Sequence, residues 1–323
     1  MRTPVAVGVV LERDSGLAFV RALEQIPKAT LGWVCDRRPR RDDGSWGPWA
    51  RTSHLDDVLQ DEEVDVIVVS AGIVARSEIA ARALGADKHV LVEGTIAAEA
   101  DEAERLVREA HRRQRVLFGI HRSQLHPATR ELKRLASLGR LGEIYYLRAL
   151  RNGDRDASDE VWSLVAEEVA RVLHVLEDEP VEVFARGDSY GGADVDVVCC
   201  LLRFATGITA QIDVSTLDAR PLRRLAVVAS DATALLDEFV PTPLSIHDAR
   251  RSDVFSPYVG PADTAIEACE LFLSAVRATT PPPPPRDAVV VVTVVEALRR
   301  SLDLGGVSAP PAALQPGLRV LGG

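Results

Sequence analysis

The chain has 323 residues, a length that favours two domains, because a single hydrophobic core seldom serves more than about 250 to 300 residues. Charged residues make up 27% of the chain and hydrophobic residues 46%, which is the composition of folded globular proteins and excludes a disordered chain. The net charge of −10 argues against a nucleic-acid partner and against binding to an anionic membrane.

The first residues, MRTPVAVGVV, enter a strand at once, without the basic and apolar regions of a secretory signal. No apolar run approaches the roughly 20 residues that span a bilayer. We therefore expect a cytoplasmic protein with no membrane partner. The four cysteines have no metal-ligand spacing, so we expect free thiols and no metal site.

The segment Val5–Asp36 has the pattern of a strand, a turn, a helix and a second strand. In a dinucleotide-binding unit this turn carries G-x-G-x-x-G, and an acidic residue about 20 positions later binds the ribose hydroxyls. Here Leu11 and Arg13 replace the first two glycines, whereas Gly16 and Asp36 stand at the third glycine and the acidic position. Arg13 either fills the phosphate groove or supplies a positive charge to a phosphate.

The next segment begins with Arg37 in an arginine-rich loop. The loop is either a solvated charged segment or a place where Arg37 packs on an adenine or contacts a phosphate. Strands and helices then alternate up to Ile120, which predicts a doubly wound parallel sheet, the Rossmann arrangement. The expected elements are helices at Leu55–Leu59, Glu78–Leu84 and Ala98–Arg113 and strands at Val64–Val69, His89–Glu93 and Val116–Ile120.

From His121 onward the pattern changes to two helices followed by a run of strands, which predicts an α+β domain with a large open, mostly antiparallel sheet. The expected helices are His126–Leu138 and Glu160–Leu176, and the expected strands are Glu143–Arg151, Val181–Ala185, Asp194–Phe204, Ile208–Thr216, Arg224–Ser230 and Thr233–Glu238. A helix at Thr264–Ala278 and a stiff spacer at Pro281–Pro285 follow. The last segment, Asp287–Leu304, is valine-rich at its start and helix-forming at its end, so the pattern leaves its structure open.

Several phrases resemble the Gfo/Idh/MocA family, whose namesakes are glucose-fructose oxidoreductase and inositol dehydrogenase. They are HRSQLHPA at 121–128, GRLGEI at 139–144, EPVEV at 179–183 and FLSAVR at 272–277, and together they look most like the branch that oxidises nucleotide-linked sugars. The resemblance implies a dinucleotide-binding domain at 1–120 and a substrate and oligomerisation domain at 121–323. It also implies NAD or NADP as cofactor and a helix at Val289–Leu304.

The resemblance implies a lysine next to the reacting hydroxyl and the nicotinamide, within Glu-Lys-Pro after a strand. The chain has Glu93 followed by Gly94, and glycine offers no group for proton transfer or charge stabilisation. The family also has Asp-x-x-x-His on a helix, and with Trp162 as register these positions are Ser163 and Glu167. The carboxylate of Glu167 is either a base with a raised pKa or, with Glu168, part of a solvated helix face.

Two further departures lie near the nicotinamide ribose, where Ala71-Gly72-Ile73 and Arg76 replace the family's Thr-Pro-Asn and histidine. Arg122 and His126 are candidates for binding an anionic or hydroxylated substrate, and the alternative is that they cap and orient the helix after Pro127.

Because the losses fall on the cofactor and hydride-transfer positions, the leading hypothesis is a pseudo-oxidoreductase that acts as an auxiliary or ligand-binding subunit. The second is an active NAD(P)-dependent oxidoreductase for a sugar-like substrate, which uses Gly16, Asp36, Arg37, Glu93, His121, Arg122 and His126. The third is a non-redox lyase or isomerase. In this family the sheet of the second domain commonly forms the subunit interface, so we expect a homo- or hetero-oligomer.

Overall fold

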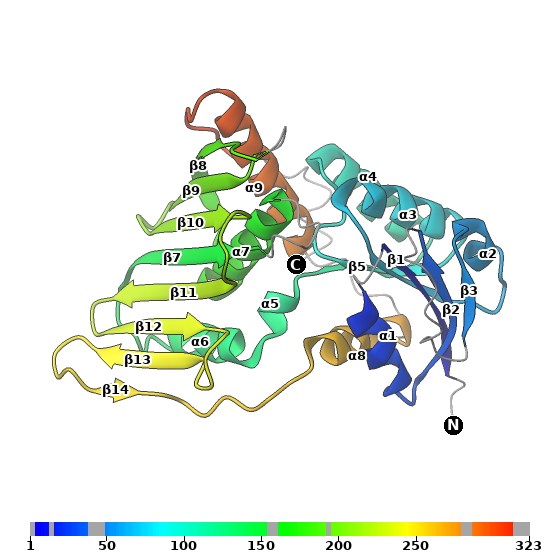
Figure 1. Ribbon diagram of the computed structural model, residues 1–323, viewed down its shortest axis with the longest axis horizontal. Coiled ribbons are helices and arrows are strands. Elements are labelled where there is room, and N and C mark those ends of the chain that lie inside the picture. Colours follow the sequence, from blue (N-terminus) through cyan, green and yellow to red (C-terminus); the bar gives the residue numbers. More distant parts are fainter. Residues whose placement is uncertain are drawn as a thin grey trace. The chain divides into compact units, whose positions relative to one another are not determined.

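The computed structural model describes residues 4–12, 16–37, 49–153, 161–191, 195–278 and 286–312. Within them the chain divides into two compact units, which Figure 1 shows together. The first unit contains Met1–Arg122 and Asp263–Val292, and the second contains Ser123–Ala262 and Thr293–Ala313. The first boundary is two residues from the predicted one, but residues 263–292, which the linear division assigned to the second domain, group with the first. The described residues contain no helix that is long and apolar enough to cross a membrane.

The first unit is built on a six-stranded parallel sheet in the order β3-β2-β1-β4-β5-β6. The strands are β1 (Val5–Leu11), β2 (Ala29–Asp36), β3 (Ala50–Thr52), β4 (Val66–Ser70), β5 (His89–Glu93) and β6 (Leu117–Ile120). The central strands β1 and β4 are almost entirely buried because helices cover both faces of the sheet. This confirms the predicted doubly wound Rossmann sheet.

Helices α2 (Leu55–Leu59), α3 (Ile73–Gly85) and α4 (Ala100–Arg112) lie on one face of this sheet, and α1 (Leu17–Glu24) and α8 (Thr264–Val276) lie on the other (Figure 1). The α8 helix packs on the sheet through Phe272, whose ring meets that of Phe118 edge-on with centroids 5.6 Å apart. Nearby, Arg277 donates to the carbonyl of Lys28. These contacts explain why α8 groups with the first unit although it follows the second in sequence.

The second unit is built on an eight-stranded sheet in the order β14-β13-β12-β11-β7-β10-β9-β8. All neighbours pair antiparallel except β7 and β10, which confirms the predicted mostly antiparallel sheet. The strands are β7 (Ile144–Asn152), β8 (Pro180–Asp188), β9 (Val197–Phe204), β10 (Thr209–Ser215), β11 (Leu222–Ala229), β12 (Ala232–Asp237), β13 (Leu244–Asp248) and β14 (Val254–Phe255).

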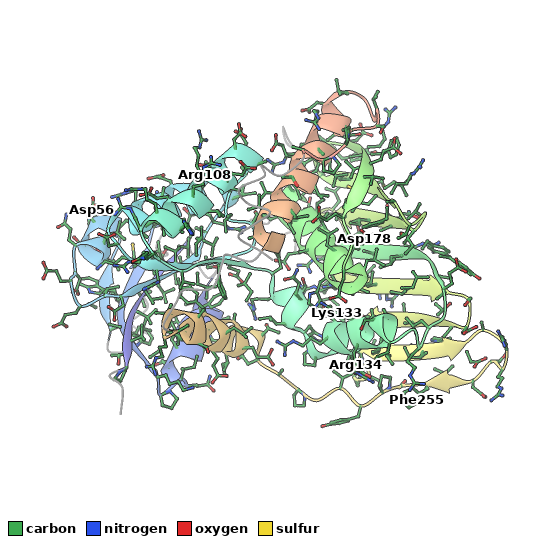
Figure 2. The ribbon with its side chains drawn as sticks, turned by 180° about the vertical axis from the view of Figure 1, so that it is seen from behind. Asp56, Arg108, Lys133, Arg134, Asp178 and Phe255 are labelled. Atoms are coloured by element: carbon green, nitrogen blue, oxygen red, sulfur yellow. The ribbon has the colours of Figure 1, made fainter. Side chains whose placement is uncertain are left out.

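Helices α6 (Pro127–Ser137) and α7 (Val161–Leu176) cover one face of this sheet (Figure 1). The strands alternate accordingly, with buried residues such as Leu147 and Ala149 beneath the helices and exposed residues such as Tyr146 and Arg148 on the other face. Figure 2 marks the charged side chains Lys133 and Arg134 of α6, which bind Glu177 and Glu131.

The segment that the pattern left open forms the helix α9 (Arg286–Asp303), as the family resemblance implies. Its valines from Val289 to Val295 are buried, and burial of apolar surface outweighs the roughly 0.5 kcal/mol per residue by which β-branched residues disfavour a helix. The α3 helix starts at Ile73, five residues before the predicted start. Strands β3, β13 and β14 and the short helix α5 (Arg122–Leu125) were not predicted, and the proline spacer lies outside the described residues.

Candidate functional site

The carboxyl edge of the parallel sheet gathers several of the predicted site residues of the first unit. Leu11 is paired with Asp36 of β2 and with Ser70 of β4, and Glu93 ends β5. Because parallel strands end at the same edge, and ligands of open α/β sheets bind there, this edge is the candidate cofactor site.

Asp36 is buried at the end of β2, at the position expected for the ribose-binding carboxylate. The next residue, Arg37, donates its backbone N–H to the carbonyl of Leu11 at 3.0 Å. Its Nη1 is buried and has no hydrogen-bond partner among the described residues. A buried guanidinium N–H without an acceptor is costly, and a ligand oxygen would satisfy it.

Among the described residues, the turn after β1 departs from a phosphate cradle at Leu11 and Glu12 and keeps one feature of it at Gly16. Leu11 continues the strand and is fully buried. Gly16 keeps a left-handed φ of 83°, and a Cβ there would lie 2.8 Å from the Cβ of Ser70, so only glycine fits. The Glu12 carboxylate accepts from the backbone N–H of Gly72 at 3.1 Å, at the N-terminus of α3. Arg13 lies outside the described residues.

The described residues of this edge fit the ribose part of a dinucleotide but not its phosphates. Asp36 and Gly16 suit the ribose and the close approach of helix and strand. Glu12, by contrast, places a carboxylate in the turn where two phosphate charges would have to bind, and like charges repel. The described part of the phosphate turn therefore carries a charge that opposes phosphate binding.

Gly94 follows β5 with a φ of 84°, at the position where the family has its lysine. A Cβ at this position would lie 2.6 Å from Nη1 of Arg76, whose Nε donates to the carbonyl of Ala71. The guanidinium of Arg76 therefore occupies the space into which a side chain at position 94 would extend. The sequence placed both residues among the departures but gave no sign that they meet.

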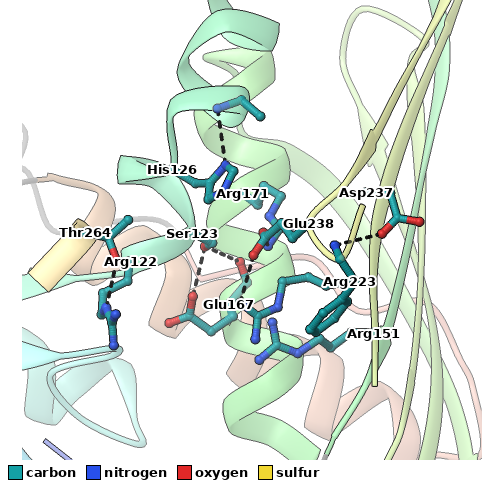
Figure 3. A network of polar contacts seen from close by, with 12 residues as sticks. Arg122, Ser123, His126, Arg151, Glu167, Arg171, Arg223, Asp237, Glu238 and Thr264 are labelled. Atoms are coloured by element: carbon teal, nitrogen blue, oxygen red, sulfur yellow. Dashed lines mark hydrogen bonds and ion pairs between the residues drawn. The ribbon is translucent and has the colours of Figure 1, made fainter. Parts of the chain in front are cut away.

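Glu93 and Arg122, two predicted ligand-binding residues, are bonded within the first unit. Ser70 donates its hydroxyl to Glu93 at 2.5 Å, and Arg122 pairs with Glu93 at 3.5 Å. Arg122 also donates from Nε to the hydroxyl of Thr264 at 3.0 Å (Figure 3), and its guanidinium lies 5.9 Å from the ring centroid of Phe19. Arg122, at the start of α5, thus connects β5 with α8 and α1, and His121 next to it is buried.

In the second unit His126 has the capping role that was the alternative to substrate binding. Its Nδ1 accepts from the backbone N–H of Ala128 at 3.2 Å, and Pro127 occupies the first position of α6 (Figure 3). Burial lowers the pKa of His126, which keeps the accepting nitrogen unprotonated.

The two positions of the family's Asp-x-x-x-His lie on α7, one helical turn apart. Glu167 accepts a hydrogen bond from the hydroxyl of Ser123 at 2.9 Å (Figure 3). Trp162, which set the register, stacks with Arg299, whose guanidinium lies 5.2 Å from the indole centroid. The expectation that Glu167 and Glu168 form a solvated face is wrong for Glu168, which is fully buried against the sheet.

Glu168 belongs to a buried ionic cluster that sequence analysis missed. Arg171 of α7 is fully buried and binds Glu238 at 2.5 Å, and Arg223 of β11 binds the same carboxylate at 2.9 Å. Arg151 of β7 and Arg171 lie 3.7 and 3.5 Å from the two oxygens of Glu168, whose pKa is raised by burial. The cluster thus holds three arginines and two glutamates, and no local pattern in the sequence predicts it.

Comparison with known proteins agrees with these observations. Residues 14–121 match the family model described as an oxidoreductase family with an NAD-binding Rossmann fold. A UDP-N-acetylglucosamine 3-dehydrogenase from Acidithiobacillus ferrooxidans is 26% identical over 179 residues, which span 54% of this chain and 56% of that protein. The match thus covers little more than half of the relative's length.

Two solved structures share the fold over nearly the whole chain. The UDP-N-acetylglucosamine 3-dehydrogenase GnnA from Acidithiobacillus ferrooxidans superposes with a TM-score of 0.79 at 21% identity, over 94% of this chain and 99% of that one. GenD2 from gentamicin A biosynthesis, in complex with NAD, gives 0.79 at 23% identity over 97% and 98%. With its Rossmann domain and mostly antiparallel second sheet, the chain is similar in fold to the Gfo/Idh/MocA oxidoreductases, whose family model matches residues 14–121.

Proposed function

We propose that this chain is a pseudo-oxidoreductase, a family member that has lost hydride transfer and serves as an auxiliary, ligand-binding subunit. The observation that carries the proposal is that the Arg76 guanidinium lies 2.6 Å from where a Cβ at position 94 would be. The lysine position holds a glycine, and the space beside it is occupied by a guanidinium, which stays protonated at any physiological pH and cannot relay a proton.

The other half of the acid–base apparatus supports the same conclusion. Ser163 and Glu167 replace the aspartate and histidine of α7, and the Glu167 carboxylate accepts from Ser123. A hydrogen bond donated to a carboxylate favours its charged form and makes it a weaker base toward an alcohol. Together with Glu12 in the phosphate turn, these replacements remove proton transfer and weaken dinucleotide binding.

The test is calorimetry with NAD⁺, NADH, NADP⁺ and NADPH at millimolar concentration, followed by an absorbance assay for nicotinamide reduction with sugar and nucleotide-sugar substrates. We expect no binding tighter than about millimolar and no reduction, because the phosphate charges meet Glu12. Micromolar binding together with turnover would overturn the proposal.

One observation favours a second candidate, an active NAD(P)-dependent oxidoreductase. The Arg76 guanidinium brings a positive charge to the place of the missing lysine, and a fixed cation can stabilise an alkoxide as it develops. In that case Arg76→Ala would lower kcat by about 10²- to 10³-fold with little change in KM. Without such an effect, Arg76 has only a structural role.

A further inference from the structure

Arg151 and Arg223 stand directly opposite each other on neighbouring antiparallel strands. Arg151 of β7 is paired in register with Arg223 of β11, and both side chains are on the face that α6 and α7 cover. Opposite residues of such a pair have Cβ atoms about 4.5 to 5.5 Å apart, and like charges placed there destabilise a sheet. A fold that keeps two guanidinium groups in this position calls for an anion close by.

The carboxylates of the described residues neutralise this pair only in part. Glu238 is bound by Arg223 and by the fully buried Arg171. Among the described residues, Arg151 has one ion pair, at 3.7 Å to Glu168, and this distance is too long for a hydrogen bond. Glu167, which accepts from Ser123, adds a negative charge that acts on Arg151.

The hydrogen-bonding capacity of the cluster is also incompletely used. The side chain of Arg151 is 10% exposed, and its Nε has no hydrogen-bond partner among the described residues; the same holds for Nε of Arg223. Arg223 is 33% exposed, so the cluster reaches the surface of the unit at this residue. Burial and then the charge of Arg223 lower the pKa of Arg151, a sign that the two cations lie close together.

We propose that Arg151 and Arg223 form a clamp for a small oxyanion, the carboxylate or phosphate group of a small-molecule ligand. Arg171 and Glu238 are positioning residues, because Glu238 holds the guanidinium of Arg223 while Arg171 fixes Glu238 from within the core (Figure 3). The planar guanidinium fork matches both kinds of oxyanion in bidentate geometry. The proposal gives a ligand class to the ligand-binding role proposed above.

The experiment is calorimetric titration of the full chain with inorganic phosphate, with D-glucuronate and, as neutral control, with D-glucose. We expect the wild-type chain to bind phosphate or glucuronate but not glucose, and the one that binds more tightly identifies the source of the oxyanion. The affinity for the anion should fall as salt is added, because the contact between the anion and the two arginines is electrostatic and is partly exposed to solvent.

The matched variants are Arg223→Gln and Arg224→Gln. Arg224 is the next residue of β11, but it lies on the opposite face of the sheet, where it binds Asp237 at 2.5 Å. We expect Arg223→Gln to weaken binding by about ten- to hundredfold and Arg224→Gln to change it by less than about twofold. Arg223→Lys keeps the positive charge but loses the planar guanidinium, so we expect it to weaken binding by an intermediate amount. This variant keeps the proposal testable if Arg223→Gln does not fold.

Absence of anion binding by the wild-type chain, or equal losses in both glutamine variants, would overturn the clamp. Neither result bears on hydride transfer, which the nicotinamide assay measures separately. A positive anion titration together with active turnover would retain the clamp and reject the pseudo-oxidoreductase.

Discussion

Gly94 has a left-handed backbone and a guanidinium beside its Cα, so two separate costs oppose any side chain there. We predict that Gly94→Lys yields no dehydrogenase activity and lowers the free energy of unfolding by about 2 kcal/mol or more, from the positive φ and the displacement of Arg76. Denaturant unfolding and the nicotinamide assay measure the two effects.

Gly139 provides the matched control, because its φ of 65° is also left-handed but nothing lies within 4 Å of a Cβ. Gly139→Lys should therefore cost only the backbone term, about 1 kcal/mol. The double variant with Arg76→Ala should recover part of the stability lost at position 94. Dehydrogenase activity in Gly94→Lys alone would contradict the proposed function.

His89 couples the stability of the first unit to pH. Its Nδ1 accepts from the backbone N–H of Val116 at 2.9 Å, and burial lowers its pKa from 6.5 to about 4. The neutral form is the one that the fold stabilises, so this contribution is complete above pH 6.5 and is lost as the pH falls toward 4. We predict a loss of about 2 to 3 kcal/mol over this window from His89 alone.

Urea unfolding at pH 7.5 and 4.5 measures this loss, with His89→Gln and His111→Gln compared with the wild type. His111 is exposed on α4, so its replacement should leave the pH dependence unchanged. His89→Gln should reduce the difference in unfolding free energy between the two pH values. If that difference is the same in His89→Gln as in the wild type, other groups cause the pH dependence.

At the scale of elements, α8 shows how a helix distant in sequence completes the first unit. Phe272 is almost fully buried against Phe118 of β6, whereas its neighbour Leu271 is 48% exposed. We predict that Phe272→Ala lowers the free energy of unfolding by about 3 to 5 kcal/mol, because the cavity and the lost apolar contact add.

Leu271→Ala should change stability by less than about 0.5 kcal/mol. Hydrogen exchange followed by mass spectrometry locates the effect, and we expect faster exchange in β6 and α1 of Phe272→Ala. Faster exchange confined to the strands of the second unit would contradict the grouping of α8 with the first.

At the scale of the whole molecule, the sheet of the second unit has one face that no described helix covers (Figure 1). The exposed side chains of this face include Tyr146 and Leu201, which are 37% and 39% exposed, and Arg148, which is on β7 with Tyr146 and in register with Leu201 of β9 across the intervening strand β10. A partly apolar sheet face of this kind favours association. We propose that the chain forms an oligomer through it.

Light scattering after gel filtration gives the test. We predict that the wild-type chain is at least dimeric and that Leu201→Glu with Tyr146→Glu makes it monomeric, because two carboxylates per copy would be buried. Val74→Glu is the control, since Val74 is 75% exposed on α3 of the first unit. A monomeric wild type, or an oligomer unchanged by the double variant, would reject this interface.

Sequence patterns predicted those structural features that depend on interactions between residues close together in the chain. The bounds of β5 were predicted to the residue, because a short apolar run between turn residues marks a buried parallel strand. The cap of α6 was foreseen as an alternative role for His126, because the signal is Pro127 next to it. The valines of α9 show the opposite case, since their propensity favours a strand and only the family resemblance gave the helix.

The sequence by itself therefore determined the two fold classes, the order of their elements and the replacement of the family's chemical groups at Leu11, Gly94, Ser163 and Glu167. Only the tertiary structure decided what those replacements contact. Arg76 and Gly94 are 18 positions apart and meet because the chain returns through β5, and Arg151 faces Arg223 across 72 positions because β7 pairs with β11. Side-chain periodicity is set by neighbours along the chain, whereas burial and charge pairing are set by residues that the fold brings together.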